Sequence, residues 1–173
     1  MSNPRIKLDY DILSKYFKYE HEEGRFFRKI QMGNYKPDSE VTVAEHHSGY
    51  KYISIKIDCK RHNLSLHRIA WTLYYKKIPE NFIDHINHIR SDNRIENLRE
   101  VSKVENNKNQ SMPKHNTSGF VGVSYHKRDK IWEARIKVNY NQIYLGRFKT
   151  KEEAIEARKK AEVQYGFHAN HGR

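Results

Sequence analysis

Short segments of period-two alternation, followed by helical spacing, constrain the fold of this 173-residue chain most. Residues 50–57, YKYISIKI, alternate apolar and polar side chains, which is typical of a half-buried strand. Residues 64–66 could form the returning strand of a hairpin. From His67 until Pro79 the apolar residues instead recur every three or four positions, at Ile69, Ala70, Leu73 and Tyr74. Strands and helices that alternate over such short lengths predict an α+β fold.

The C-terminal third shows the same two patterns in a clearer order. Three strand-like runs are separated by the turn-forming sequences HKRDK and NYNQ, and they lie at residues 120–125, 132–138 and 143–148. A helix is expected next, because Thr150 with Glu153 three residues later forms a capping box. We therefore predict a module of three antiparallel strands and one helix at residues 119–173, preceded by a linker at residues 111–118 that is rich in turn formers.

The chain is strongly basic, with 33 Lys and Arg against 21 Asp and Glu and a formal net charge of +12. This charge favours a polyanionic partner, because each phosphate that a protein neutralises releases bound counterions. A basic surface that serves solubility alone is the simpler alternative. A membrane suits the chain less well, since it has no long basic amphipathic helix and no apolar run of about 18 residues.

Two further features indicate an intracellular, cytoplasmic protein. The N-terminal sequence MSNPRIKLDYDIL is polar and lacks the apolar core of a signal peptide. Cys59 is the only cysteine, which excludes an intramolecular disulfide and a Cys-rich zinc site.

The residues between Asp84 and Asn109 carry the candidate chemistry. Hydrolysis of a phosphodiester needs an activated water and stabilisation of the growing negative charge, which an imidazole and one bound cation can provide. Asp84 and His85 end an apolar run and could supply a metal ligand and that base. Neighbouring side chains of a strand point to opposite faces, so a bend or bulge must let both residues serve one site.

This stretch resembles the HNH (His-Asn-His) endonucleases, whose ββα-metal site is a two-stranded hairpin followed by a helix. It is most similar to the phage- and intron-encoded homing endonucleases of that family. The resemblance covers about 45 residues and rests on five short motifs, Leu66-His67-Arg68, Asp84-His85-Ile86-Asn87, Asp92-Asn93-Arg94, Glu96-Asn97-Leu98-Arg99 and Glu105-Asn106-Asn107-Lys108-Asn109.

The resemblance implies a role for each motif position in a nuclease core at residues 67–110. His85 would be the general base, and Asn97 would join the hairpin to its loop by side-chain hydrogen bonds. Asp84 and Asn106 would hold one divalent cation, Mg²⁺ or Mn²⁺, since carboxylate and amide oxygens suit hard cations. Asn109, three residues along the same helical face, is the alternative second ligand. Three arginines of this region are expected to contact DNA, namely Arg68, Arg94 and Arg99.

One residue departs from the family pattern. His88 stands where the homing subgroup commonly has glycine, and histidine tolerates a positive φ only at some strain. The rival interpretation is a non-catalytic, sequence-specific DNA-binding regulator that retains an HNH-like centre. A nuclease directed at RNA is a third possibility.

The C-terminal module resembles the AP2/ERF DNA-binding domain, through the motifs at residues 116–124, 132–136, 145–148 and 152–154. Strand alternation places Trp132, Ala134 and Ile136 against the helix, and Glu133, Arg135 and Lys137 on an open face. Such a sheet could lie in the major groove of double-stranded DNA. The candidate DNA contacts on this face are Ser124, His126, Arg128, Arg135, Lys137, Tyr144 and Arg147.

The strands of residues 1–66 provide a third candidate DNA surface. Alternation places Lys51, Ser54 and Lys56 near one face of residues 50–57 or at its edges. Nothing in the sequence indicates an obligate protein partner, so we expect a monomer or a weak dimer.

Overall fold

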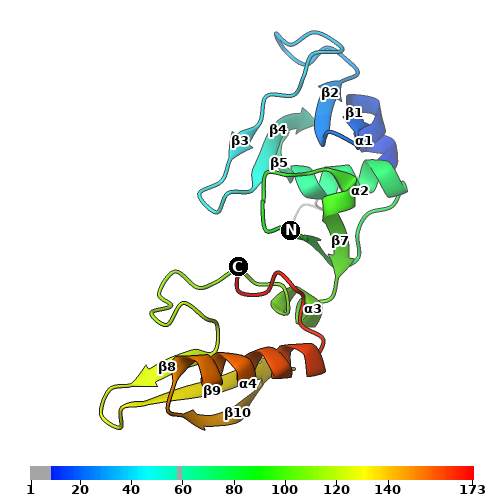
Figure 1. Cartoon of the computed structure of the whole chain (residues 1–173). Helices are drawn as coiled ribbons and strands as arrows, with labels where there is room; N and C mark the ends of the chain where they lie inside the picture. The colour runs from blue at the N-terminus through cyan, green and yellow to red at the C-terminus, as the bar shows by residue number, and fades with distance from the viewer. Residues whose placement is uncertain (1–8, 58–59) are drawn as a thin grey trace, which may run out of the picture. The chain divides into compact units, whose positions relative to one another are not determined.

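The computed structural model describes residues 9–57 and 60–173, so Cys59 and most of the polar N-terminal sequence lie outside the described residues. The chain forms two compact units, which divide between Ser102 and Lys103. In Figure 1 the first unit runs from blue to green and the second from green to red. Each unit combines small antiparallel sheets with helices, which confirms the predicted α+β class.

The first unit begins with a helix, α1 (Tyr10–Tyr16), where we expected only strands. Its start is set by Asp9, whose carboxylate accepts a hydrogen bond from the Ile12 amide at 3.1 Å. A hairpin then follows, made of β1 (Phe17–Glu20) and β2 (Arg25–Arg28). Gly24 closes its turn at a φ of 70°, where a Cβ atom would lie 2.7 Å from the backbone nitrogen of Arg94.

A three-stranded sheet completes the predicted β-rich part, and a helix begins the predicted nuclease core. Strand β4 (Lys51–Ile57) lies between β3 (Ala44–Glu45) and β5 (Lys60–Ser65). Helix α2 (Leu66–Tyr75) begins directly after β5, one residue earlier than predicted. It ends at Lys76, which adopts a left-handed φ of 54°, before Pro79 is reached.

The lysines of β4 do not share a face, which corrects one expectation. Lys51 has the same parity as Ile53 and Ile55, which are buried, and it forms an ion pair with Glu45. Lys56 has the opposite parity and is exposed, with Arg61 across from it on β5. Of the two lysines Lys51 and Lys56, only Lys56 therefore lies on the exposed face of this sheet.

One apolar core runs through the whole first unit. It contains residues from α1, β1, β2, β4 and α2, and it extends to Ile83 and Leu98 of a second hairpin. That hairpin pairs β6 (Phe82–His85) with β7 (Leu98–Val101) and encloses a short 3₁₀ helix, η1 (Ile95–Asn97). The expected β-rich part and the nuclease hairpin thus share one core, and the structure shows no division between residues 66 and 67.

The second unit starts with the five-residue helix α3 (Lys103–Asn107), immediately after Ser102. A sheet of order β8-β9-β10 follows, made of β8 (Val123–His126), β9 (Ile131–Val138) and β10 (Asn141–Phe148). Helix α4 (Lys151–Gln164) has the predicted capping box of Thr150 and Glu153. None of the helices in the described parts of the chain is long and apolar enough to cross a membrane.

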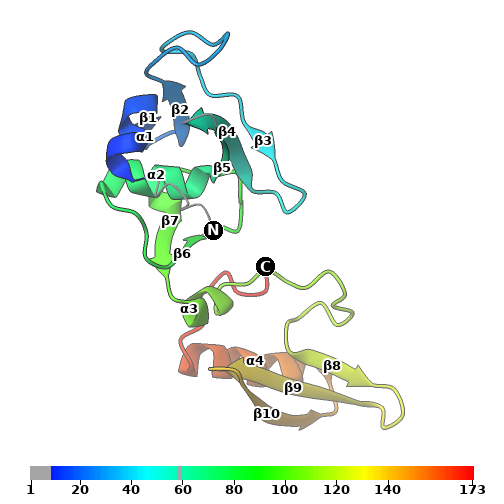
Figure 2. The same cartoon turned by 180° about the vertical axis from the view of Figure 1, so that it is seen from behind.

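Helix α4 covers one face of this sheet and leaves the other open. It lies in front of the sheet in Figure 1 and behind it in Figure 2. On the covered face, Ala134 and Ile136 are buried as predicted, and Trp132 is partly buried. Arg135 and Lys137 are exposed on the open face.

Candidate active site and nucleic-acid interface

The β6–β7 hairpin places His85 at the last position of β6. Four consecutive residue pairs form its register, from Phe82 opposite Val101 to His85 opposite Leu98. The Ile86 amide donates to the Asn97 carbonyl at 2.9 Å, so the loop between the strands closes directly beyond His85. The chain turns away at once, with a hydrogen bond of 3.1 Å from the His88 amide to the His85 carbonyl.

The His85 imidazole is buried, with 2% of the residue exposed, and Asn93 orients it. Nδ2 of Asn93 donates to the Ser91 carbonyl at 3.2 Å, so Oδ1 is the atom that faces His85 Nε2 at 3.3 Å. This contact favours the tautomer with its proton on Nε2 and its basic lone pair on Nδ1. Burial lowers the pKa of His85, although the bond to Asn93 and the charges of Asp84 and Asp92 act in the opposite direction.

Two aromatic residues from distant parts of the first unit pack around His85. His67, near the start of α2, meets it edge-on with ring centroids 5.4 Å apart. Tyr50, which precedes β4, lies 5.8 Å from His85 and 5.1 Å from His67. Burial, with help from the neighbouring His85 and Arg68, lowers the pKa of His67 to about 3. His67 is therefore neutral at pH 7 and packs against the His85 ring.

The Asp84 carboxylate pairs with Arg99. Oδ2 of Asp84 accepts from Arg99 Nε at 3.1 Å and from Nη2 at 2.8 Å. Arg99 is its cross-strand partner, so Asp84 keeps the regular strand register, and the bend that we expected between Asp84 and His85 is not present. Within residues 9–57 and 60–173, no three His, Cys, Asp or Glu side chains cluster as a metal site.

Asn97 joins the end of the hairpin to the loop through both ends of its side chain. Oδ1 accepts from the Asn87 amide at 3.0 Å, and Nδ2 donates to the Asp92 carbonyl at 2.9 Å. The residue is 6% exposed, so water can replace neither bond easily. Asn97 thus connects the end of the hairpin to residues 87 and 92 of the loop.

A second polar network rigidifies the loop itself. The Asp92 carboxylate accepts from Nδ2 of Asn87 at 2.8 Å and from Nε and Nη2 of Arg94 at 2.9 and 2.8 Å. The bonds from Arg94 contribute most to lowering the pKa of Asp92 to about 2. His88 has a φ of 64°, so the turn does require the left-handed conformation that glycine would adopt without strain.

The three arginines expected to contact DNA here all have partners within the unit. Arg68 donates to the carbonyls of Pro79 and Asn81, Arg94 pairs with Asp92 and Glu96, and Arg99 pairs with Asp84. A phosphate would have to compete with these contacts. The contacts of Arg68 and Arg99 join segments that are distant in the sequence, so sequence reasoning could not detect them, whereas Arg94 pairs with residues only two positions away.

The two candidate asparagine ligands belong to the second unit and differ in exposure. Asn106 lies in α3 and is half-buried. Asn109 follows the end of the helix at Asn107, so it does not continue the helical face as we expected, and it is only 3% exposed. Accessibility therefore favours Asn106 as the residue that could reach a cation.

The open face of the β8–β10 sheet carries the basic and polar residues that alternation placed there. Ser124, Arg135, Tyr144 and Arg147 come from three neighbouring strands, in a register that sets Arg135 opposite Tyr144. Arg128 lies in the turn between β8 and β9, is 93% exposed and pairs with the adjacent Asp129. Glu133 also lies on this face, but it is buried, which strand alternation alone does not predict.

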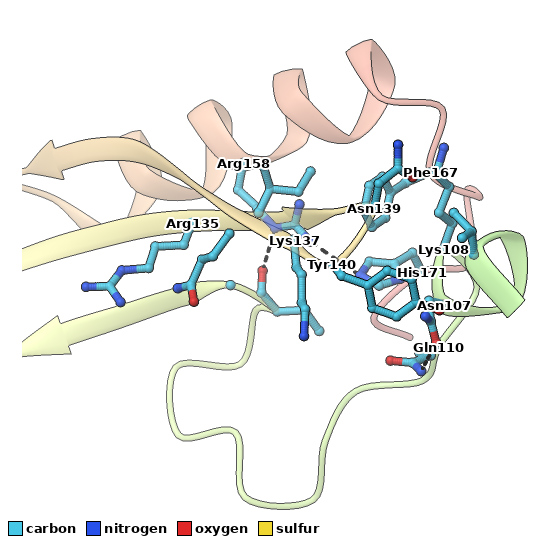
Figure 3. A pocket seen from close by; sticks show the side chains of 15 residues that line it. Asn107, Lys108, Gln110, Arg135, Lys137, Asn139, Tyr140, Arg158, Phe167 and His171 are labelled. Carbon is cyan, nitrogen blue, oxygen red and sulfur yellow. Dashed lines mark hydrogen bonds between the residues drawn. The ribbon is translucent and has the colours of Figure 1, made fainter.

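A pocket of about 430 Å³ lies beside this sheet, within the second unit (Figure 3). Residues of α3, the β9–β10 turn and the C-terminal segment line it, including Lys108, Tyr140 and Phe167. Arg158 at its wall is buried and has a structural role, because Nε donates to the Val121 carbonyl at 3.0 Å. Lys108 likewise donates to the Tyr165 carbonyl at 2.7 Å, so both of these cations are already bonded to backbone carbonyls of the second unit.

The segment that contains His85 is similar to a known protein family. Residues 65–108 match the family model of the HNH endonucleases. The chain is also similar to protein 3.8 of Escherichia phage T7, with 32% identity over 77 residues. This match covers 44% of the present chain and 64% of that phage protein, which is less than two thirds of its length. Together the two matches support an HNH nuclease and relate the chain to a phage protein.

Proposed function

We propose that the protein is a metal-dependent HNH endonuclease that hydrolyses phosphodiester bonds in double-stranded DNA. The observation that carries this proposal is the state of His85. It is a buried imidazole at the end of the β6–β7 hairpin, oriented by Asn93, inside the segment that matches the HNH endonucleases, and its burial lowers its pKa. A histidine whose pKa lies below its ordinary value is unprotonated at pH 7 and can accept a proton from water.

In this proposal His85, Asn93 and Asn97 have separate roles. Nδ1 of His85 accepts the proton of the attacking water, while Asn93 holds the ring and its tautomer. Asn97 fixes the loop against the hairpin. Because His85 is 2% exposed, Tyr50 or another covering side chain must move before DNA can approach the ring.

A divalent cation, Mg²⁺ or Mn²⁺, is the proposed cofactor, with Asp84 and Asn106 as its protein ligands. Their carboxylate and amide oxygens form a donor set that suits a hard cation. When bound, such a cation stabilises negative charge on the phosphate and on the leaving oxygen. Arg99 already compensates the charge of Asp84, so it must share or release this carboxylate when a cation binds.

We further propose that the second unit is an AP2/ERF-like DNA-binding domain that reads duplex DNA with its open sheet face, as in a homing endonuclease. The support is its three-stranded sheet with one helix on one face, and the exposed Arg135, Lys137 and Arg147 on the other. The net charge of +12 supports duplex DNA as the partner.

Supercoiled plasmid tests the proposal, with linear duplex and single-stranded RNA as parallel substrates. The wild-type protein should convert plasmid to the nicked or linear form with Mg²⁺ or Mn²⁺, and EDTA should stop it. Discrete product ends would support the homing type. Binding of DNA without cleavage in either metal would favour the regulator, and cleavage confined to RNA would overturn the choice of substrate.

A further inference from the structure

The open face of the β8–β10 sheet contains a buried acid at its centre. Glu133 lies on β9 with the same parity as Arg135 and Lys137, so its side chain belongs to that face. Its side chain is 3% exposed, against 47% for Arg135 and 55% for Arg147. Burying a carboxylate costs free energy unless cations compensate its charge, so the groups around Glu133 determine that cost.

Nitrogen atoms of three side chains, one from each strand, lie around this carboxylate. Oε1 pairs with Nε of Arg135, which leaves the two Nη groups of that guanidinium for other partners. Oε2 lies 3.8 Å from Nε of Arg147 and 3.6 Å from Nε2 of His126. The Glu133 carboxylate therefore faces two arginines, and Arg147 also lies 4.0 Å from Asp129, which pairs with Arg128. Three arginines thus stand against two carboxylates. The cluster stays cationic and would attract an anion.

A bulge in β10 brings Arg147 to this face. The register runs from Tyr144 opposite Arg135 to Gly146 opposite Ala134, so one extra residue is inserted between them. Arg147 then stands directly opposite Glu133. Without the extra residue, alternation would turn Arg147 toward the side that α4 covers. The bulge thus places Arg147 next to the buried carboxylate of Glu133.

We infer that Glu133 is a positioning residue that holds Arg135 and Arg147 as a clamp for a DNA phosphate. This inference rests on the proposed binding of DNA by the second unit. Arginine side chains lose rotamer freedom when they bind, and a carboxylate that fixes them beforehand removes that cost. The forked guanidinium groups then present Nη donors to phosphate oxygens.

The test distinguishes the effect of removing a negative charge from the effect of no longer positioning the two arginines. Glu133→Gln and the control Glu156→Gln each remove one negative charge, and Glu156 is exposed on α4, where it pairs with Lys160. If only charge matters, both variants should bind duplex DNA as tightly as the wild-type protein, or more tightly. The clamp predicts that Glu133→Gln binds about 5- to 150-fold more weakly, because two arginine side chains must then be ordered on binding, at ~0.5–1.5 kcal/mol each.

The measurement is fluorescence anisotropy of a labelled duplex at fixed salt, with thermal melting to confirm that each variant is folded. Binding by Glu133→Gln that equals or exceeds that of Glu156→Gln overturns the inference. Should Glu133→Gln fail to fold, Glu133→Asp keeps the charge, shortens the side chain by one methylene and should still weaken binding. Absence of DNA binding by the wild-type protein would overturn the proposed function and, with it, the clamp.

A double-mutant cycle separates a clamp from a general weakening of the sheet. Arg135→Lys keeps the charge but cannot reproduce the Nε pair with Glu133. If Glu133 acts through Arg135, the double variant should lose less affinity than the sum of the two single losses. Fully additive losses would contradict the coupling.

Discussion

Replacement of Asn97 by alanine should destabilise the first unit by about 2–4 kcal/mol. The side chain is 6% exposed and makes two hydrogen bonds, of 3.0 Å from the Asn87 amide and 2.9 Å to the Asp92 carbonyl. Each such bond contributes ~1 kcal/mol, and a partner left buried without a bond costs ~1–3 kcal/mol. Small proteins are stable by only ~5–15 kcal/mol, so this loss is large.

Urea unfolding at pH 7 measures the effect as a shift of the midpoint at constant m-value. Asn34→Ala is the matched control, because Asn34 is exposed in a turn of the same unit. Asn97→Asp refines the test, since it keeps the acceptor for the Asn87 amide but places a carboxylate oxygen against the Asp92 carbonyl. It should be about as harmful as alanine at pH 7 and less harmful at low pH. A loss below about 0.5 kcal/mol for Asn97→Ala would refute the bridging role.

Three further predictions concern the surroundings of His85. The pKa of His67 is lowered to about 3 from 6.5, so its stabilising contribution is complete above pH 6.5 and is lost as the pH falls toward 3. In His67→Phe the free energy of unfolding, measured with urea, should fall over that pH range by roughly 3–5 kcal/mol less than in the wild-type protein. His88→Gly should raise the free energy of unfolding by about 0.5–1 kcal/mol, because a φ of 64° strains any other residue, and an unchanged or lower value would mean that the turn is not strained. Tyr50→Ala should speed deuterium exchange at Cε1 of His85, measured by mass spectrometry, since Tyr50 covers that ring, while Tyr75→Ala should leave it unchanged.

Local patterns in the sequence predicted much of the fold. Alternation located β4 and all three strands of the second unit, and the Thr150–Glu153 capping box located α4. Helix α1 was missed, although Asp9 is a capping residue, because the aromatic residues that follow also favour strands. Short-range signals of this kind are strong where one residue decides a terminus and weak where two propensities compete.

The site was predictable only in part, for a physical reason. The hairpin and helix motifs located His85 and Asn97, whereas the packing of Tyr50 and His67 around His85 depends on contacts between distant segments. The pairing of Asp84 with Arg99 depends on strand register, which the sequence did not provide. Strand alternation placed Glu133 on the open face, but its contact with Arg147 depends on the bulge between Tyr144 and Gly146.

Cleavage of plasmid DNA by His85→Ala tests the central claim most directly. With Mg²⁺ present, this variant should bind duplex DNA like the wild-type protein and nick it at least ~10²-fold more slowly, the contribution expected of a general base. His115→Ala, which removes an exposed histidine of the second unit, should cleave normally. Cleavage by His85→Ala at the wild-type rate would contradict the assignment of His85 as the base.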